Sequence, residues 1–205
     1  MISLTPTPLI AILRGIHPHE AEVIACVIVE AGFGAIEVPL NSPEPLKSIE
    51  IIARSLGDRT LVGAGTVLSC DDVDRVARVG AKLVVAPNAD GAVIARAFNL
   101  GVARLPGVAT PTEAFRALWL GASALKLFPA EAMPPDVVKA WRSVLPKKTQ
   151  LFPVGGITPE RIAPYRKAGA DGFGVGGALY KPGMTAAEVE RAATAFVAAW
   201  READG

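Results

Sequence analysis

Two charged residues lie where a folded chain ordinarily places apolar ones. Lys126 is in the middle of an apolar, β-forming run at residues 124–129 (ALKLFP), and Glu37 holds the same kind of position at residues 35–40 (AIEVPL). Burial disfavours the ammonium form of a lysine, whereas a nearby carboxylate partly opposes that effect. A neutral amine can attack a ketone and form an iminium, and a glutamate beside it can move the protons. The two residues therefore indicate Schiff-base chemistry, provided that the fold brings them together.

Eight β-forming runs recur along the 205-residue chain and alternate with stretches of helical periodicity. The runs are residues 8–14, 35–40, 61–67, 82–87, 102–107, 124–129, 150–156 and 172–177. Strands that alternate with helices indicate parallel βαβ units, and eight such compact units predict a (β/α)8 barrel, the TIM barrel. We expect a single domain over residues 1–205, with the last helix from about Thr185 to Glu202. A doubly wound open sheet is the alternative, but it usually has fewer strands and a glycine-rich first turn, which Arg14-Gly15-Ile16 does not provide.

The expected helix ends carry matching signals. Glycines suited to a left-handed C′ position follow six helical stretches, at Gly32, Gly57, Gly80, Gly101, Gly121 and Gly169. Prolines suited to the first helical position follow His17, Ser42, Thr110 and Thr158. Thr110 with Glu113, and Thr185 with Glu188, have the spacing of a capping box.

The strand period of two predicts where Lys126 and Glu37 point. Leu125 and Leu127 suit the helix-covered side of their strand, which sends Lys126 into the barrel interior. The apolar neighbours of Glu37 in the second run send its carboxyl group inward in the same way. Both strands are even-numbered and can contribute to one interior layer near the C-terminal mouth, where barrel enzymes work. A purely structural buried ion pair is the alternative, although such pairs seldom stabilise more than apolar residues would.

Two glycine pairs come at the ends of the seventh and eighth expected strands. They are Gly155 with Gly156, and Gly176 with Gly177. Loops at these two places form the usual phosphate site of (β/α)8 barrels, and glycine allows the backbone N–H groups to approach the anion closely. Either pair alone would be explained by a tight turn. Both together predict a phosphate-binding site.

Other residues at strand ends are candidates for binding the rest of a substrate. Arg14 ends the first strand in inward phase and suits a carboxylate or a phosphate, unless it pairs with a neighbouring acid. Thr66 ends the third strand with a hydroxyl group, and the small Gly63 and Gly65 before it are expected to leave room for a ligand. Pro87 and Phe128 are apolar walls that suit a methyl or methylene group.

Composition excludes several other classes of protein. The 21 basic and 20 acidic residues nearly cancel, so no basic field calls for nucleic acid or an anionic membrane surface. No segment approaches the ~18 uninterrupted apolar residues of a membrane span. Two distant cysteines, Cys26 and Cys70, are expected to be free, buried thiols in a reducing cytoplasm. His17 and His19 are the only histidines, and no cluster has metal-ligand spacing, so we expect neither a metal nor another cofactor.

The chain resembles a known family, the class I 2-keto-3-deoxy-6-phosphogluconate/galactonate aldolases. The likeness runs nearly end to end through AILRG, IEVPLNSP, VGAGTVL, VVAPN, KLFPAE and PVGGITPE. It implies that Lys126 forms the Schiff base, that Glu37 is the acid and base, and that Arg14, Thr66 and the glycine loops bind substrate. It also implies a homotrimer. Trp119 and Trp141 are candidates for an apolar exterior, but either could equally lie in the core.

Within that family, the segment IEVPLNSP resembles the 6-phosphogalactonate branch. The gluconate branch typically has threonine, leucine and arginine where this chain has Pro39, Leu40 and Asn41, and it usually has threonine at the position of Val154. Val154 is therefore a candidate for specificity at the substrate C4 oxygen. Gly177 replaces a serine common in the family, which implies that a hydroxyl contact to phosphate is lost.

The expected reaction is the cleavage of 2-dehydro-3-deoxy-6-phospho-D-galactonate to pyruvate and D-glyceraldehyde 3-phosphate. The same chemistry on the gluconate epimer or on 4-hydroxy-2-oxoglutarate is the nearest alternative. A phosphosugar isomerase, a decarboxylase or a thiazole-type synthase on the same barrel is a more remote one, because those enzymes commonly rely on Asp, Cys or His at strand ends. A non-catalytic sugar-phosphate-binding protein would bind the ligand without forming an adduct.

Overall fold

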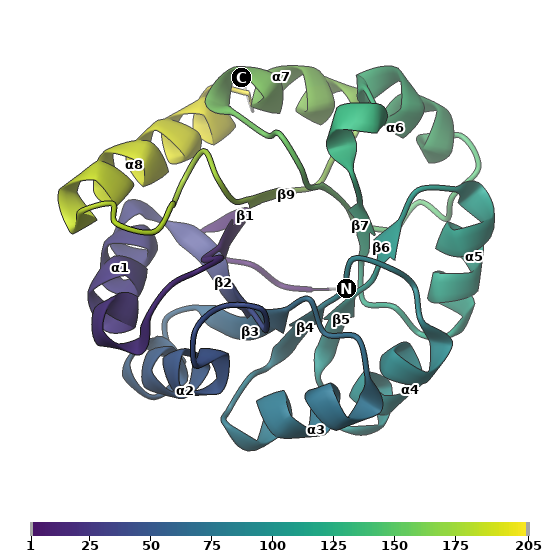
Figure 1. The fold of residues 1–205 in the computed structure, drawn as a ribbon. Coiled ribbons are helices and arrows are strands. Elements are labelled where there is room, and N and C mark those ends of the chain that lie inside the picture. The colour runs from purple at the N-terminus through teal and green to yellow at the C-terminus, as the bar shows by residue number, and fades with distance from the viewer. Residues whose placement is uncertain (1, 204–205) are drawn as a thin grey trace.

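Parallel strands and covering helices alternate through residues 2–203, the part of the chain that the computed structural model describes. The strands are β1 (Thr7–Ile12), β2 (Phe33–Pro39), β3 (Leu61–Gly65), β4 (Leu83–Val85), β5 (Ala103–Leu105), β6 (Gly107–Val108), β7 (Leu125–Leu127), β8 (Leu151–Pro153) and β9 (Phe173–Val175). Six pair in the order β5-β4-β3-β2-β1-β9, and three pair in the order β6-β7-β8. The strands form the inner ring of Figure 1.

The two sheets are halves of one closed barrel. β5 and β6 are separated only by Pro106, which has no N–H group to give to the ladder. On the other side, a parallel bridge between Val154 and Gly174 joins the end of β8 to β9. β5 and β6 therefore act as one strand of eight, and the predicted (β/α)8 barrel is confirmed.

Eight α-helices within the described residues cover the barrel and form the outer ring of Figure 1. They are α1 (Pro18–Ala31), α2 (Pro45–Leu56), α3 (Cys70–Arg78), α4 (Gly91–Asn99), α5 (Pro111–Trp119), α6 (Pro135–Arg142), α7 (Pro159–Ala168) and α8 (Ala186–Glu202). A short 3-10 helix, η1 (Ala130–Ala132), follows β7. No helix among residues 2–203 combines the length and the apolar character needed to cross a membrane.

Most of the predicted helix ends are confirmed, and two are wrong. The capping boxes at Thr110 and Thr185 are both formed, and five of the six glycines have a positive φ. Gly57 instead has a φ of −62°, because the chain continues in a right-handed turn in which the Thr60 N–H reaches the Leu56 carbonyl. The prediction that α2 starts at Pro43 is also wrong, since Pro45 holds the first helical position.

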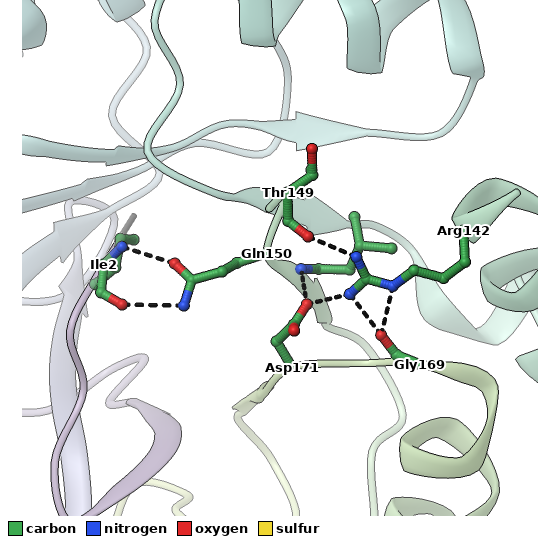
Figure 2. Close-up of polar contacts among 7 residues, drawn as sticks. Ile2, Arg142, Thr149, Gln150, Gly169 and Asp171 are labelled. Carbon is green, nitrogen blue, oxygen red and sulfur yellow. Dashed lines mark hydrogen bonds and ion pairs between the residues drawn. The ribbon is translucent and has the colours of Figure 1, made fainter. Parts of the chain in front are cut away.

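The N-terminal end of the barrel is closed by the chain itself. Ile2 is only 5% exposed and packs in an interior cluster with residues such as Ile10 and Phe152. The side-chain amide of Gln150 holds the Ile2 backbone by two hydrogen bonds, since its Oε1 accepts the Ile2 N–H at 2.7 Å and its Nε2 donates to the Ile2 carbonyl at 3.1 Å (Figure 2). In Figure 1 the N-terminal segment that leads into β1 crosses the space that the strands enclose.

A second group of contacts at the same end ties helices to strands. Arg142, from α6, donates hydrogen bonds to the carbonyl groups of Thr149 and Gly169 and pairs with Asp171 (Figure 2). Asp171 also accepts the backbone N–H of Leu151 at 2.7 Å. Because the N-terminal end is plugged and braced in this way, the opposite, C-terminal mouth is the end at which a ligand can enter.

Candidate active site

Lys126 lies on β7 with its side chain inside the barrel. Its neighbours Leu125 and Leu127 belong to the outer core that packs against the helices, whereas Ala124 belongs to the inner cluster. The lysine is 6% exposed, lines the cavity at the mouth and holds its Nζ 4.7 Å from the centre of the Phe128 ring. Burial lowers the pKa of Lys126, an effect that Glu37 opposes and that the positive charge of Arg14 reinforces. At a given pH, a larger fraction of Lys126 is therefore in the neutral amine form than for a lysine in water.

Glu37, on β2, is buried in the interior at 2% exposure. Burial raises the pKa of its carboxyl group to about 7, against the lowering influence of Lys126 and Arg14. Among the described residues its Oε2 has no hydrogen-bond partner. A buried, unpaired carboxyl oxygen costs free energy in the folded state, so its retention here points to a chemical use.

The glycines of β3 serve a different purpose from the one predicted. A Cβ atom at Gly65 would lie 1.7 Å from Glu37 Oε2, and one at Gly63 would lie 2.4 Å from the Leu83 carbonyl oxygen. The space above Gly65 therefore holds the Glu37 carboxyl group, and that above Gly63 is filled by β4. The expectation that both glycines leave room for a ligand is wrong.

One cavity of about 530 Å³ opens at the C-terminal mouth. Its lining includes Lys126 and every residue predicted to bind substrate or set specificity, namely Arg14, Thr66, Pro87, Phe128, Val154, Gly155, Gly156, Gly176 and Gly177. Glu37 is not part of the lining and acts on the cavity through its electrostatic interaction with Lys126. The barrel thus brings together residues from nearly the whole length of the chain.

Sequence reasoning missed six lining residues. They are Ile12, Ile157, Thr158, Gly174, Ala178 and Lys181. Ile12 shares the inward phase of Arg14, and the others lie in or just beyond the strands that carry the two glycine pairs. The position of Thr158 and Lys181 a few residues past those glycines is the signal that would have identified them.

Arg14 and Thr66 form the polar side of the mouth. The Arg14 guanidinium donates to the side-chain oxygen of Asn41 and, at 3.5 Å, to the Thr66 hydroxyl. Within residues 2–203 it forms no salt bridge, so its charge is not neutralised by a direct carboxylate partner. Thr66 has a φ of +55°, which is an outlier for a β-branched residue and indicates backbone strain at this position.

The glycine loops form the opposite side. Gly155 and Gly156 have φ values of +112° and +57°, and a Cβ atom on either would come within 3 Å of the Glu131 side chain. After β9, the N–H groups of Leu179 and Tyr180 both bond to the Gly176 carbonyl, which closes one helical turn. The first N–H groups of such a turn have no carbonyl partner within it and favour an anion.

The two histidines lie outside this cavity. His17 and His19 are at the start of α1, with ring centres 5.5 Å apart, and border a separate surface depression. Among residues 2–203 no group of three or more His, Cys, Asp or Glu side chains is arranged to hold a metal ion.

Comparison with known proteins places this geometry in a family. The model of the family described as "Aldolase: KDPG and KHG aldolase" matches residues 2–194. The chain is 49% identical to the 2-dehydro-3-deoxy-6-phosphogalactonate aldolase of Escherichia coli (strain K12), over 97% of each protein. It is 34% identical to the 2-dehydro-3-deoxy-phosphogluconate aldolase of Zymomonas mobilis, over 71% of this chain and 69% of the relative. A solved structure described as "Native KDPGal structure" is 48% identical and superposes with a TM-score of 0.97, over 100% of this chain and 99% of that one.

Proposed function

Because this chain belongs to the KDPG and KHG aldolase family, we propose that it reversibly cleaves 2-dehydro-3-deoxy-6-phospho-D-galactonate to pyruvate and D-glyceraldehyde 3-phosphate. The observation that carries the proposal is the buried Lys126, which lines a cavity open to solvent and interacts electrostatically with the buried Glu37 behind it. The choice of sugar acid is supported by the identity to the galactonate enzyme, 49% over nearly the full length, against 34% over about 70% for the gluconate enzyme.

The proposed mechanism uses Lys126 as the nucleophile. Its neutral amine attacks the C2 ketone, and Glu37 moves the protons as the carbinolamine loses water to give an iminium. Glu37, directly or through a water molecule, then removes the proton of the C4 hydroxyl group. The C3–C4 bond breaks, its electrons flow into the iminium to form an enamine, and glyceraldehyde 3-phosphate leaves. Protonation of the enamine and hydrolysis of the iminium release pyruvate and restore the lysine.

The other lining residues hold the substrate in this scheme. Arg14 and Thr66 bind the carboxylate, since a charged guanidinium and a hydroxyl group point into one side of the cavity. The glycine pairs after β8 and β9 bind the phosphate through backbone N–H groups. Pro87 and Phe128 are apolar walls beside the pyruvyl methylene group.

Reductive trapping tests the nucleophile. Borohydride added with pyruvate is expected to increase the mass of the protein by one reduced pyruvyl group, located on Lys126 by peptide mapping. The Lys126→Ala variant should give no adduct. Lys167→Ala, which removes an exposed lysine on α7, is the matched control and should be trapped like the wild type. An adduct on another lysine, or cleavage without any trapped adduct, would refute the mechanism.

Val154 is the residue we propose for discrimination at C4. It is 5% exposed, lines the cavity and packs against Gly174. A Cβ atom on Gly174 would lie 2.7 Å from the Cγ2 atom of Val154. Threonine is nearly isosteric with valine, so Val154→Thr should add a hydroxyl group without repacking the wall. The ratio of kcat/KM for the galactonate over the gluconate substrate should exceed one in the wild type and fall in the variant. A wild type that prefers the gluconate or 4-hydroxy-2-oxoglutarate substrate would refute this choice of substrate.

We also propose that the enzyme works in the cytoplasm as a homotrimer. Both cysteines are free, which suits a reducing compartment, but they are only partly buried, so the prediction of buried thiols is wrong. The apolar side chains of Phe98, Phe115 and Trp119 are exposed on the outer surface of α4 and α5, and Trp119 is 85% exposed. Exposed apolar surface of this kind favours contact with another subunit. Trp141, the other exterior candidate, is buried at 6% exposure and belongs to the core.

A further inference from the structure

Lys181 is a basic residue of the cavity to which the scheme above gives no role. It follows the turn after β9 and lines the cavity with Gly176, Gly177 and Ala178. The other basic side chains in the lining, within the described residues, are Arg14 and Lys126. Lys126 must be neutral to attack a ketone, so only two fixed positive charges remain for a substrate that carries a carboxylate and a phosphate.

The two charges serve different sides of the cavity. Arg14 leaves the end of β1 and turns toward the loops after β2 and β3, where it meets Asn41 and Thr66. Lys181 belongs to the loop after β9, on the other side of β1 in the sheet order. This loop and the one after β8 carry the glycine pairs. The side of the cavity to which we assign the phosphate therefore has a cationic residue of its own, Lys181.

The backbone on both sides of Lys181 is held in place, whereas its side chain is available. Tyr180 is 2% exposed and its hydroxyl group donates to Glu20 at 3.0 Å. Pro182 packs so closely on Gly15 that a Cβ atom there would lie 2.7 Å from its ring. The Lys181 side chain is exposed, and within residues 2–203 its ammonium group forms no salt bridge or hydrogen bond.

Gly177 lines the same part of the cavity as Lys181 but has no side chain with which to contact a ligand. A Cβ atom at this position would meet nothing within 4 Å, so the space in front of the turn is open. We propose that Lys181 binds the substrate phosphate from this side and supplies the side-chain contact that Gly177 cannot provide. The inference rests on the proposed function, because it assigns one residue to the phosphate of that substrate.

The experiment compares phosphorylated and unphosphorylated substrate. Lys181→Gln should lower kcat/KM for 2-dehydro-3-deoxy-6-phosphogalactonate by about tenfold, because a charge-assisted contact is lost. It should leave kcat/KM for 2-dehydro-3-deoxygalactonate and the borohydride trapping of pyruvate unchanged. Lys148→Gln is the matched control, since it removes the same charge from an exposed lysine before β8, at the closed end of the barrel. It should leave kcat/KM unchanged for both substrates.

A second variant keeps the test independent of net charge. Gly177→Ser, placed in the Lys181→Gln protein, should recover part of the lost kcat/KM on the phosphorylated substrate only, because the new hydroxyl group has open space. An unchanged preference for the phosphorylated substrate in Lys181→Gln, or an equal loss on both substrates, would overturn the role of Lys181 while leaving the proposed function intact. A wild type that traps pyruvate but does not cleave the phosphorylated substrate would overturn both.

Discussion

Residue by residue, the proposed chemistry depends on a carboxyl group that the fold has removed from water. Burial raises the pKa of Glu37 to about 7, and the nearby charges of Lys126 and Arg14 offset only part of this rise. A group that both gives and takes protons within one catalytic cycle works best when its pKa is near the working pH. The same burial lowers the pKa of Lys126. Burial therefore shifts the pKa values of both the proposed acid–base group and the proposed nucleophile toward neutrality.

The pH dependence of cleavage follows from this pKa. The base that removes the C4 hydroxyl proton must be ionised, and burial moves its pKa upward, so kcat/KM should fall as the pH drops through about 7. An unperturbed glutamate would lose activity only near its ordinary pKa of 4.5. The Glu37→Gln variant should lose about 10²- to 10⁴-fold in rate. Its residual activity should no longer show the step near pH 7. Persistence of that step in the variant would assign it to the substrate phosphate instead.

Thr66 combines a side chain that we propose binds substrate with a strained backbone. Its φ of +55° suits glycine, so Thr66→Gly should relieve strain and stabilise the fold by about 1 kcal/mol in denaturant unfolding. The same change removes the hydroxyl group beside Arg14 and should lower kcat/KM by about tenfold. Thr66→Ala is the control, because it removes the hydroxyl group but keeps the strained geometry. A loss of stability in the glycine variant would show that the observed conformation is not strained.

Between elements, the packing of β2 against β3 positions Glu37, the proposed acid–base group. Gly65 pairs with Pro39 in the ladder, and its missing side chain gives the Glu37 carboxyl group its space. Gly65→Ala should push that group aside and lower kcat by at least about 10²-fold, the usual contribution of a positioned acid–base group. Gly91→Ala is the control, since Gly91 starts α4 outside the cavity lining and its Cβ atom would meet only the flexible end of the Leu120 side chain, at 3.2 Å. Full activity in Gly65→Ala would mean that the placement of Glu37 tolerates displacement. Circular dichroism checks that both variants are folded.

The elements themselves could be predicted because their signals are local. Apolar runs of strand length, glycines after helices and capping boxes such as Thr110 with Glu113 depend on neighbouring residues only. The failure at Gly57 is also local, but two others involve contacts between distant segments. α2 does not begin at Pro43, and the hydroxyl group of the preceding Ser42 accepts the Gly15 N–H from the loop after β1. The space beside Gly65 holds the Glu37 side chain of β2 rather than a ligand. Neither contact can be inferred from spacing along the chain.

At the scale of the whole molecule, the barrel separates stability from chemistry. Gln150 and the buried Ile2 close the N-terminal end, together with the Arg142–Asp171 cluster of Figure 2. Charged groups with shifted pKa values, the strained Thr66 and the open glycine turns gather at the other end. These costly features are tolerated at the mouth because the closed end and the helix-covered wall hold the strands in register. Changes at the closed end should therefore affect unfolding more than substrate turnover.

The outer surface of α4 and α5 gives the prediction for assembly. Phe115 and Trp119 are four residues apart on α5 and so share one face, with Phe98 of α4 also exposed. Trp119→Asp should place a charge in the proposed trimer contact and reduce the mass measured by light scattering after gel filtration. Val23→Asp is the matched control, because Val23 is also exposed, at 58%, but lies on α1. A wild type that elutes as a monomer would refute the homotrimer. A trimer unaffected by Trp119→Asp would place the contact on another face, since a charge cannot be buried there without a partner.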